Sequence, residues 1–78
     1  MKISVLNLPR NFTENELAKL FKTYGNIKGC TVVMDAQTGK SKGFGFVTMA
    51  LEHEGKAAIK ELNGSSIDDK RIRVKASE

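Results

Sequence analysis

The stretch Lys42-Gly43-Phe44-Gly45-Phe46-Val47-Thr48-Met49 carries most of the information in this sequence. In a β-strand, successive side chains point to opposite faces, so Gly45, Val47 and Met49 form a small apolar set that can pack on a core. The opposite face carries two aromatic rings, a cation and a hydroxyl group: Phe44, Phe46, Lys42 and Thr48. Two neighbouring rings beside a cation suit the stacking of nucleic-acid bases with a phosphate nearby.

Phenylalanine is usually buried, so the alternative is that both rings belong to the core. The flanking segments bear on this choice. Residues 2–6 alternate and are followed by Asn7-Leu8-Pro9, which predicts a first strand. Its inward side chains are Ile3 and Val5, and its outward side chains are Lys2, Ser4 and Leu6. Residues 27–34 predict a second strand and residues 43–49 a third.

Two helices and a last strand complete the predicted order. Thr13 followed by Glu16 is a capping-box pattern, which predicts a helix over 13–24 that ends before Gly25. A second helix runs from about Leu51 to Leu62, with an inner face of Gly55, Ala58, Ile59 and Leu62. The final strand, residues 71–75, turns Ile72 and Val74 inward.

The resulting βαββαβ order predicts an α+β, ferredoxin-like sandwich: a four-stranded antiparallel sheet with two helices on one face. Val47 and Met49 then face the helices, as the inward residues of the first and last strands do. Phe44 and Phe46 have the opposite parity, so we expect them on the uncovered face of the sheet.

Size and charge suit a single small domain, residues 1–78, that binds an anionic partner. The chain has a net charge of +4 and an isoelectric point of 9.4. The two predicted helices hold five acidic and four basic residues, whereas the remainder holds nine basic and four acidic residues. The excess of cations therefore lies on strands and loops, although a generally basic soluble surface is the alternative.

Several kinds of site are excluded by composition. Cys30 is the only cysteine and His53 the only histidine, so neither an intrachain disulfide nor a cysteine–histidine metal cluster can form. We expect Cys30 in the core, His53 in solvent and Asp68-Asp69 in a turn, with no metal ion and no cofactor. The sequence shows no apolar run long enough for a membrane span and no signal peptide, which predicts a cytoplasmic protein.

The octapeptide from Lys42 to Met49 resembles the motif K/R-G-F/Y-G/A-F-V-x-F/Y of the RNA-recognition motif family. Seven of its eight positions fit, with Met49 in place of the last aromatic residue. Residues 3–8 resemble the companion hexapeptide on the first strand. The compact form of the chain resembles the small bacterial members of that family with a single such domain.

The resemblance implies that Phe46 stacks on a base, that Phe44 lies against a base or between riboses, and that Lys42 contacts a phosphate. Where the family has a third aromatic residue, this chain has Ser4, which cannot stack, so one nucleotide pocket is in doubt. The implied partner is single-stranded RNA, with single-stranded DNA as a competitor, bound by a monomer. Further candidate contacts lie on or beside the open face: Lys2, Leu6, Lys40, Arg71, Arg73 and Lys75.

Two other function classes compete with RNA binding. A protein-interaction domain of the same fold would dock a peptide on the helices or on the exposed phenylalanines. An enzyme of ferredoxin-like shape, such as an acyl-phosphate hydrolase, needs an arginine-bearing anion loop, and Pro9-Arg10-Asn11 supplies the residue types without a glycine-rich cradle. We therefore expect no catalytic activity. The cations at 71, 73 and 75 also have a second interpretation, as edge charges that deter strand pairing.

Overall fold

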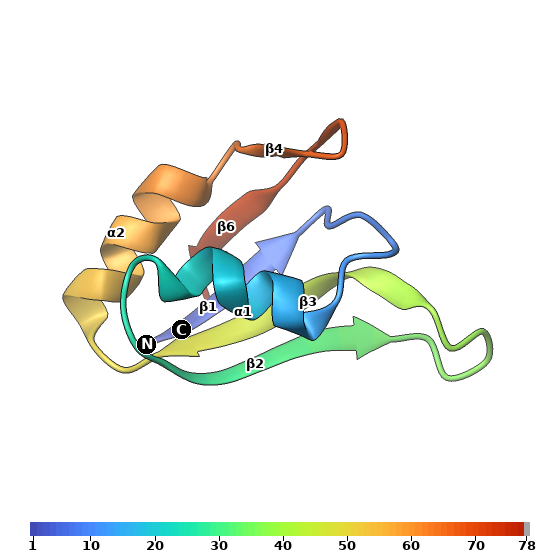
Figure 1. The fold of residues 1–78 in the computed structure, drawn as a ribbon, viewed down its shortest axis with the longest axis horizontal. Coiled ribbons are helices and arrows are strands. Elements are labelled where there is room, and N and C mark those ends of the chain that lie inside the picture. Colours follow the sequence, from blue (N-terminus) through green and yellow to red (C-terminus); the bar gives the residue numbers. More distant parts are fainter. Residues whose placement is uncertain (78) are drawn as a thin grey trace.

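The computed structural model describes residues 1–77 and has a four-stranded antiparallel sheet with the strand order β2-β3-β1-β6. Helices α1 and α2 lie together on one side of this sheet (Figure 1). The elements of this βαββαβ core are β1 (Lys2–Leu6), α1 (Glu14–Lys22), β2 (Ile27–Met34), β3 (Ser41–Met49), α2 (Glu52–Leu62) and β6 (Arg73–Ala76). The predicted fold is confirmed, with β1 and β3 at the centre of the sheet.

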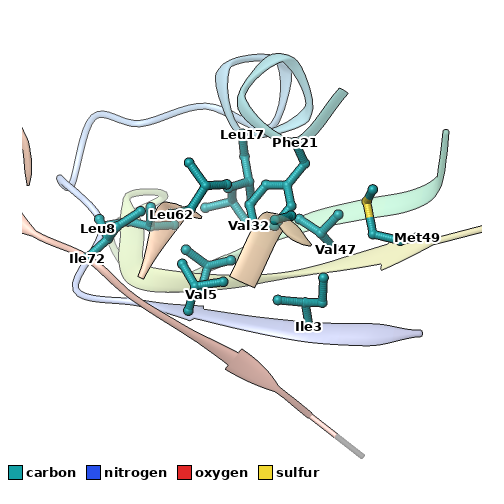
Figure 2. Close-up of a cluster of buried hydrophobic side chains, with 12 residues drawn as sticks. Ile3, Val5, Leu8, Leu17, Phe21, Val32, Val47, Met49, Leu62 and Ile72 are labelled. Atoms are coloured by element: carbon teal, nitrogen blue, oxygen red, sulfur yellow. The ribbon is translucent and has the colours of Figure 1, made fainter. Parts of the chain in front are cut away.

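The core fills the space between the sheet and the helices (Figure 2). Leu17 and Phe21 of α1 project onto the sheet, where they meet the inward side chains of the strands. Val47 and Met49 are fully buried in this cluster, as their parity on β3 predicts. Burial of this shared apolar layer is the main stabilising contribution to so small a domain.

The capping box at the start of α1 is present. The Thr13 hydroxyl accepts a hydrogen bond from the Glu16 backbone N–H at 3.2 Å, and the Glu16 carboxylate accepts one from the Thr13 N–H at 3.1 Å. The helix ends at Lys22, two residues before the predicted end. The chain tightens there, because the Tyr24 N–H bonds to the Phe21 carbonyl three residues back.

Helix α2 packs through Gly55, Ala58 and Leu62, which are buried, while Ile59 is partly buried. A β-carbon at Gly55 would lie 2.6 Å from the Met1 sulfur, so the glycine allows the helix to approach the chain at the start of β1. Neither helix of the described chain is long and apolar enough to cross a membrane.

The last strand differs from the prediction of residues 71–75. Lys70–Arg71 form β5, which pairs with β4 (Ser66–Ile67) in a separate two-stranded sheet. The backbone of Ile72 bonds to Gly64 and Ser65 rather than to β1, so pairing with β1 is confined to β6. Asp68 and Asp69, with φ of 47° and 67°, form the turn between β4 and β5. The predicted solvated turn at these two residues is confirmed.

Gly45 separates the two phenylalanines of β3 because its helix-facing side has no room for a side chain. A β-carbon there would collide with the Thr31 carbonyl oxygen and lie 3.3 Å from the Leu17 side chain. Gly45 thus allows β2 and α1 to pack closely against this point of β3. Phe44 and Phe46, the residues on either side of Gly45, point to the opposite face of the sheet because side chains alternate along a strand.

Candidate nucleic-acid interface

The sheet face turned away from the helices, here called the open face, is formed by every second residue of its strands. On β1 and β3 the intervening residues are in the core, so the side chains between them lie on the open face. The pairing register extends the same face to β2 and β6. Its residues are Lys2, Ser4, Leu6, Thr31, Phe44, Phe46, Thr48, Arg73 and Lys75.

Phe44 and Phe46 form an edge-to-face pair on the open face. Their ring centroids are 6.3 Å apart and their planes meet at 88°. Both rings are half-buried, and neither belongs to the core cluster nor packs against it. The predicted placement of the rings outside the core is therefore confirmed. Exposed apolar rings of this kind are typical of interaction surfaces.

The strand register places two cations on the β6 side of the aromatic pair. Ser4 of β1 lies between Phe46 of β3 and Lys75 of β6, and Leu6 likewise lies between Phe44 and Arg73. Both cations of β6 are exposed. A strand of nucleic acid that crosses the sheet would thus meet rings at its centre and positive charge at its β6 edge.

Lys2 lies directly over one of the two rings. Its Nζ is 4.8 Å from the centroid of Phe46, within the range of a cation–π contact. Lys42 is exposed at the other end of β3. The ring of Phe46 therefore has the ammonium group of Lys2 beside it, and a second ammonium group, that of Lys42, belongs to the residue two positions before Phe44.

Ser4 is on the open face, as predicted, but it is only 8% exposed. Its longer neighbours across the strands, Phe46 and Lys75, cover it. Within residues 1–77 its hydroxyl group has no hydrogen-bond partner. Ser4 is therefore the floor of a shallow gap in the aromatic surface, where a hydroxyl group remains available to a ligand.

Arg71 and Lys40 lie away from the open face. Arg71 is on β5, outside the four-stranded sheet, because the chain joins that sheet only at Arg73. Lys40 is in the β2–β3 loop, where it lines a groove beside the start of α1. The edge position of β6 is compatible with both interpretations of its cations, RNA contact and protection of the edge.

A groove of about 700 Å³ does not coincide with the open face. It lies beside the start of α1, and its apolar lining includes Phe12, Val32 and Met34, of which Met34 is 53% exposed. A flat stacking surface needs no concavity, because a base contacts an aromatic side chain face to face. The rings and cations of the open face are thus the stronger indication of a nucleic-acid site.

Cys30 is half-buried rather than part of the core, because β2 is an edge strand that α1 covers incompletely. Its thiol donates a hydrogen bond of 3.5 Å to the carbonyl of Glu14. Burial, and then the nearby Glu14 carboxylate, raise the pKa of the Cys30 thiol. A protonated thiol is a poor nucleophile and a poor metal ligand. His53 is exposed, as predicted, and residues 1–77 contain no group of acidic, histidine or cysteine side chains suited to a metal ion.

Three polar residues near Phe44 were not predicted from the sequence as candidate RNA contacts. Asn7, Arg10 and Lys70 lie with Lys42 and Phe44 around one cleft at the end of the sheet. Arg10 and Lys70 are far apart in the sequence and come together only through the turn of the β4–β5 hairpin. The sequence shows only one positive charge in each of two predicted loops, and this does not indicate that the two charges lie close together in the fold.

The comparisons with known proteins agree with this geometry. A family model described as the RNA recognition motif matches residues 3–73. Over 73 residues the chain is 48% identical to glycine-rich RNA-binding protein 1 of Mycosarcoma maydis, covering 94% of this chain and 42% of that protein. It is 43% identical over 76 residues to the chloroplastic RNA-binding protein CP29B of Arabidopsis thaliana, covering 97% of this chain and 26% of that protein. The chain spans less than half the length of both relatives.

Solved structures show the same fold at high similarity. A crystal structure of RNA-binding protein PG1 superposes with a TM-score of 0.94 at 38% identity, covering 100% of this chain and 95% of that one. A Sxl-lethal protein/RNA complex superposes with a TM-score of 0.94 at 36% identity, covering 99% of this chain and 46% of that one. The match to the family model runs from the second residue of β1 to the first residue of β6 and includes both helices. The chain therefore belongs to the RNA recognition motif family, whose members bind RNA without catalysing a reaction.

Proposed function

We propose that this chain binds single-stranded RNA on the open face, with Phe46 stacked on a base and Phe44 against a base or a ribose. The observation that carries the proposal is the pair of accessible rings at the centre of a sheet face that the helices leave uncovered. Single-stranded DNA offers the same bases and phosphates, so we expect it to compete. The RNA bound in the Sxl-lethal complex, whose protein shares this fold, supports the same ligand class.

Stacking and charge together set the affinity. Base–aromatic stacking is worth roughly 1–3 kcal/mol per base, so the two rings supply about 2–6 kcal/mol. A micromolar complex needs about 8 kcal/mol, so contacts to phosphate must supply the remainder. The candidates nearest the rings are Lys2, Lys42, Arg73 and Lys75. Ser4 adds at most a hydrogen bond where an aromatic residue would add a stack.

The second candidate function is protein binding, and the groove beside α1 favours it. Met34 and Phe12 offer apolar surface there, outside the open face. Protein binding in this groove predicts an affinity that salt changes little and that competitor RNA leaves unaffected. RNA binding on the open face predicts the opposite for both measurements.

The deciding variant is Phe44→Ala combined with Phe46→Ala, with folding and RNA affinity measured together. We expect the thermal unfolding transition to persist and the affinity to fall by a factor of about 30 or more, which is the loss of two stacks. Phe21→Ala is the matched control, since Phe21 is fully buried and its loss should cost about 3–5 kcal/mol of stability. Unchanged RNA affinity in the double variant would contradict the proposal.

We also propose that the chain is monomeric and cytoplasmic. The likeness to small bacterial members of the family stays a prediction, since the two relatives described above are a fungal and a chloroplast protein.

A further inference from the structure

A cleft of about 310 Å³ adjoins Phe44 at one end of the sheet. Its walls come from the end of β1, the loop after it, the start of β3 and β5. Figure 1 shows the β1–α1 loop and the β4–β5 hairpin at the same end of the molecule, away from both labelled termini. The residues that line the cleft are Leu6, Asn7, Leu8, Arg10, Lys42, Gly43, Phe44 and Lys70.

Three of these eight residues are cations and none is acidic. Arg10, Lys42 and Lys70 are all exposed, and none of them forms an ion pair within the part of the chain that the structure describes. The resemblance to the family already implies a phosphate contact at Lys42. We propose that Arg10 and Lys70, which come from two other segments, bind a further phosphodiester group of the RNA strand in this cleft, next to the nucleotide that contacts Phe44. The inference rests on the proposed function, because it extends the same strand beyond the open face.

The walls of the cleft are tied together by the backbone. The Leu8 N–H donates to the Gly43 carbonyl at 2.8 Å, which continues the contact of β1 with β3 past the end of the strand. Asn7 has a φ of 62°, and its side-chain amide donates to the Arg71 carbonyl at 2.9 Å. This bond holds the β4–β5 hairpin, and Lys70 with it, against the end of β1. The site is therefore preformed, which lowers the entropic cost of binding.

Arg10 is positioned by Gly43. A β-carbon at Gly43 would lie 3.3 Å from the Arg10 Nε, and the φ of 86° at this position also favours glycine. The Arg10 Nη1 donates to the Ser41 carbonyl at 3.4 Å. The guanidinium thus rests on the start of β3 with its remaining N–H groups unused in this contact. Planar guanidinium donors match phosphate oxygens well, and an adjacent ammonium adds charge.

The remaining lining distinguishes a strand of RNA from a free anion. Leu6 and Phe44 supply apolar surface on one side of the cations. A free phosphate ion gains nothing from that surface, whereas a nucleotide places its base or ribose on it and its phosphate among the cations. We therefore expect the cleft to favour RNA over inorganic phosphate at equal concentration.

The test combines Arg10→Gln with Lys70→Gln and measures RNA affinity over a range of salt concentrations. We expect lower affinity and a slope of log K against log[salt] that is shallower by about 0.7, the value for one phosphate on a single strand. The control removes the same charge from the helices, Lys22→Gln with Lys60→Gln, and should keep the full slope. Arg10→Lys combined with Lys70→Arg keeps both positive charges and should therefore show the full salt slope of the unaltered chain.

Several outcomes would overturn the inference. One such outcome is that the Arg10→Gln, Lys70→Gln double variant keeps the affinity and the salt slope of the helix control, while the phenylalanine double variant still loses affinity for RNA. The cleft would then bind no phosphate of the strand. Failure of the whole chain to bind RNA would instead remove the proposed function as well. Chemical shifts at Asn7 and Gly43 that respond to inorganic phosphate or to a polyglutamate peptide as strongly as to RNA would assign the cleft to another anion. Replacing Arg10 also removes its hydrogen bond to Ser41, so a change in affinity could come from a change in structure. Lys70→Gln alone therefore tests the charge at a residue that makes no such bond.

Discussion

Ser4 on β1 lies directly opposite Phe46 on β3. Directly opposed residues on one face of a sheet have β-carbons about 5 Å apart, so their side chains can touch. Here the pair joins a ring to a hydroxyl group that is only 8% exposed. The aromatic surface therefore ends at Phe46, and the neighbouring position on β1 contributes no stacking.

Ser4→Phe should fill this gap. The new ring would lie on the open face beside Phe46, where no helix obstructs it, and would offer a third stacking surface. We expect the RNA dissociation constant to fall about fivefold or more, since one stack is worth at least about 1 kcal/mol. Ser66→Phe adds the same ring at an exposed position of β4 and should leave the affinity unchanged. Equal effects of the two variants would show that added apolar surface, rather than its place, governs binding.

The salt dependence of RNA binding should distinguish the cations by position. With about three phosphates neutralised, log K should fall with log[salt] at a slope near −2. Lys75→Gln should reduce the slope by about 0.7, because Lys75 lies beside Ser4 on the open face. Arg71→Gln should change it less, because Arg71 belongs to the separate β4–β5 hairpin. A larger effect at Arg71 than at Lys75 would move the RNA path off the sheet.

The turn of the β4–β5 hairpin is open to stabilisation. Asp69 adopts a φ of 67°, which glycine tolerates better than any other residue. Asp69→Gly creates the Asp-Gly pair that two-residue hairpin turns favour and should raise the free energy of unfolding by about 0.5 kcal/mol. Asp69→Ala removes the same charge without relieving the backbone and should lower it. Urea denaturation of the two variants measures both changes, and a shift of the same sign would point to charge instead.

Cys30 should react slowly in the folded protein. Because its pKa is raised, the folded state holds the thiol proton more tightly than the unfolded state does. The protonated thiol therefore contributes to the stability of the folded state at any pH below the pKa of the unfolded state, and this contribution is lost as the pH rises through the pKa of the folded state. We expect iodoacetamide to alkylate Cys30 more slowly in buffer than in denaturant at the same alkaline pH. Equal rates would mean that neither burial nor Glu14 protects the thiol.

The sequence was sufficient where a pattern repeats along an element. Alternation specified β1, β2 and most of β3, the Thr13–Glu16 capping box specified the start of α1, and parity alone placed Phe44 and Phe46 outside the core. Parity works because a shift of one residue would exchange the core set and the open set of a whole strand.

The remaining features depend on contacts between segments that are distant in sequence. The strands β4 and β5 have two residues each, which is too short for any periodicity, and an Asp-Asp turn is a weaker signal than Asp-Gly. The cleft at Phe44 depends on the bond from Asn7 to Arg71, which no local pattern encodes. The partial exposure of Cys30 likewise depends on how far α1 extends over an edge strand.

Nuclear Overhauser effects between RNA and protein test the location of binding most directly. In a complex with single-stranded RNA, we predict contacts from base and ribose protons to the rings of Phe44 and Phe46, with the Lys75 side chain near the strand. The amides of α1 and α2 should shift little. Contacts confined to the two helices, with both rings unaffected by saturating RNA, would contradict the account.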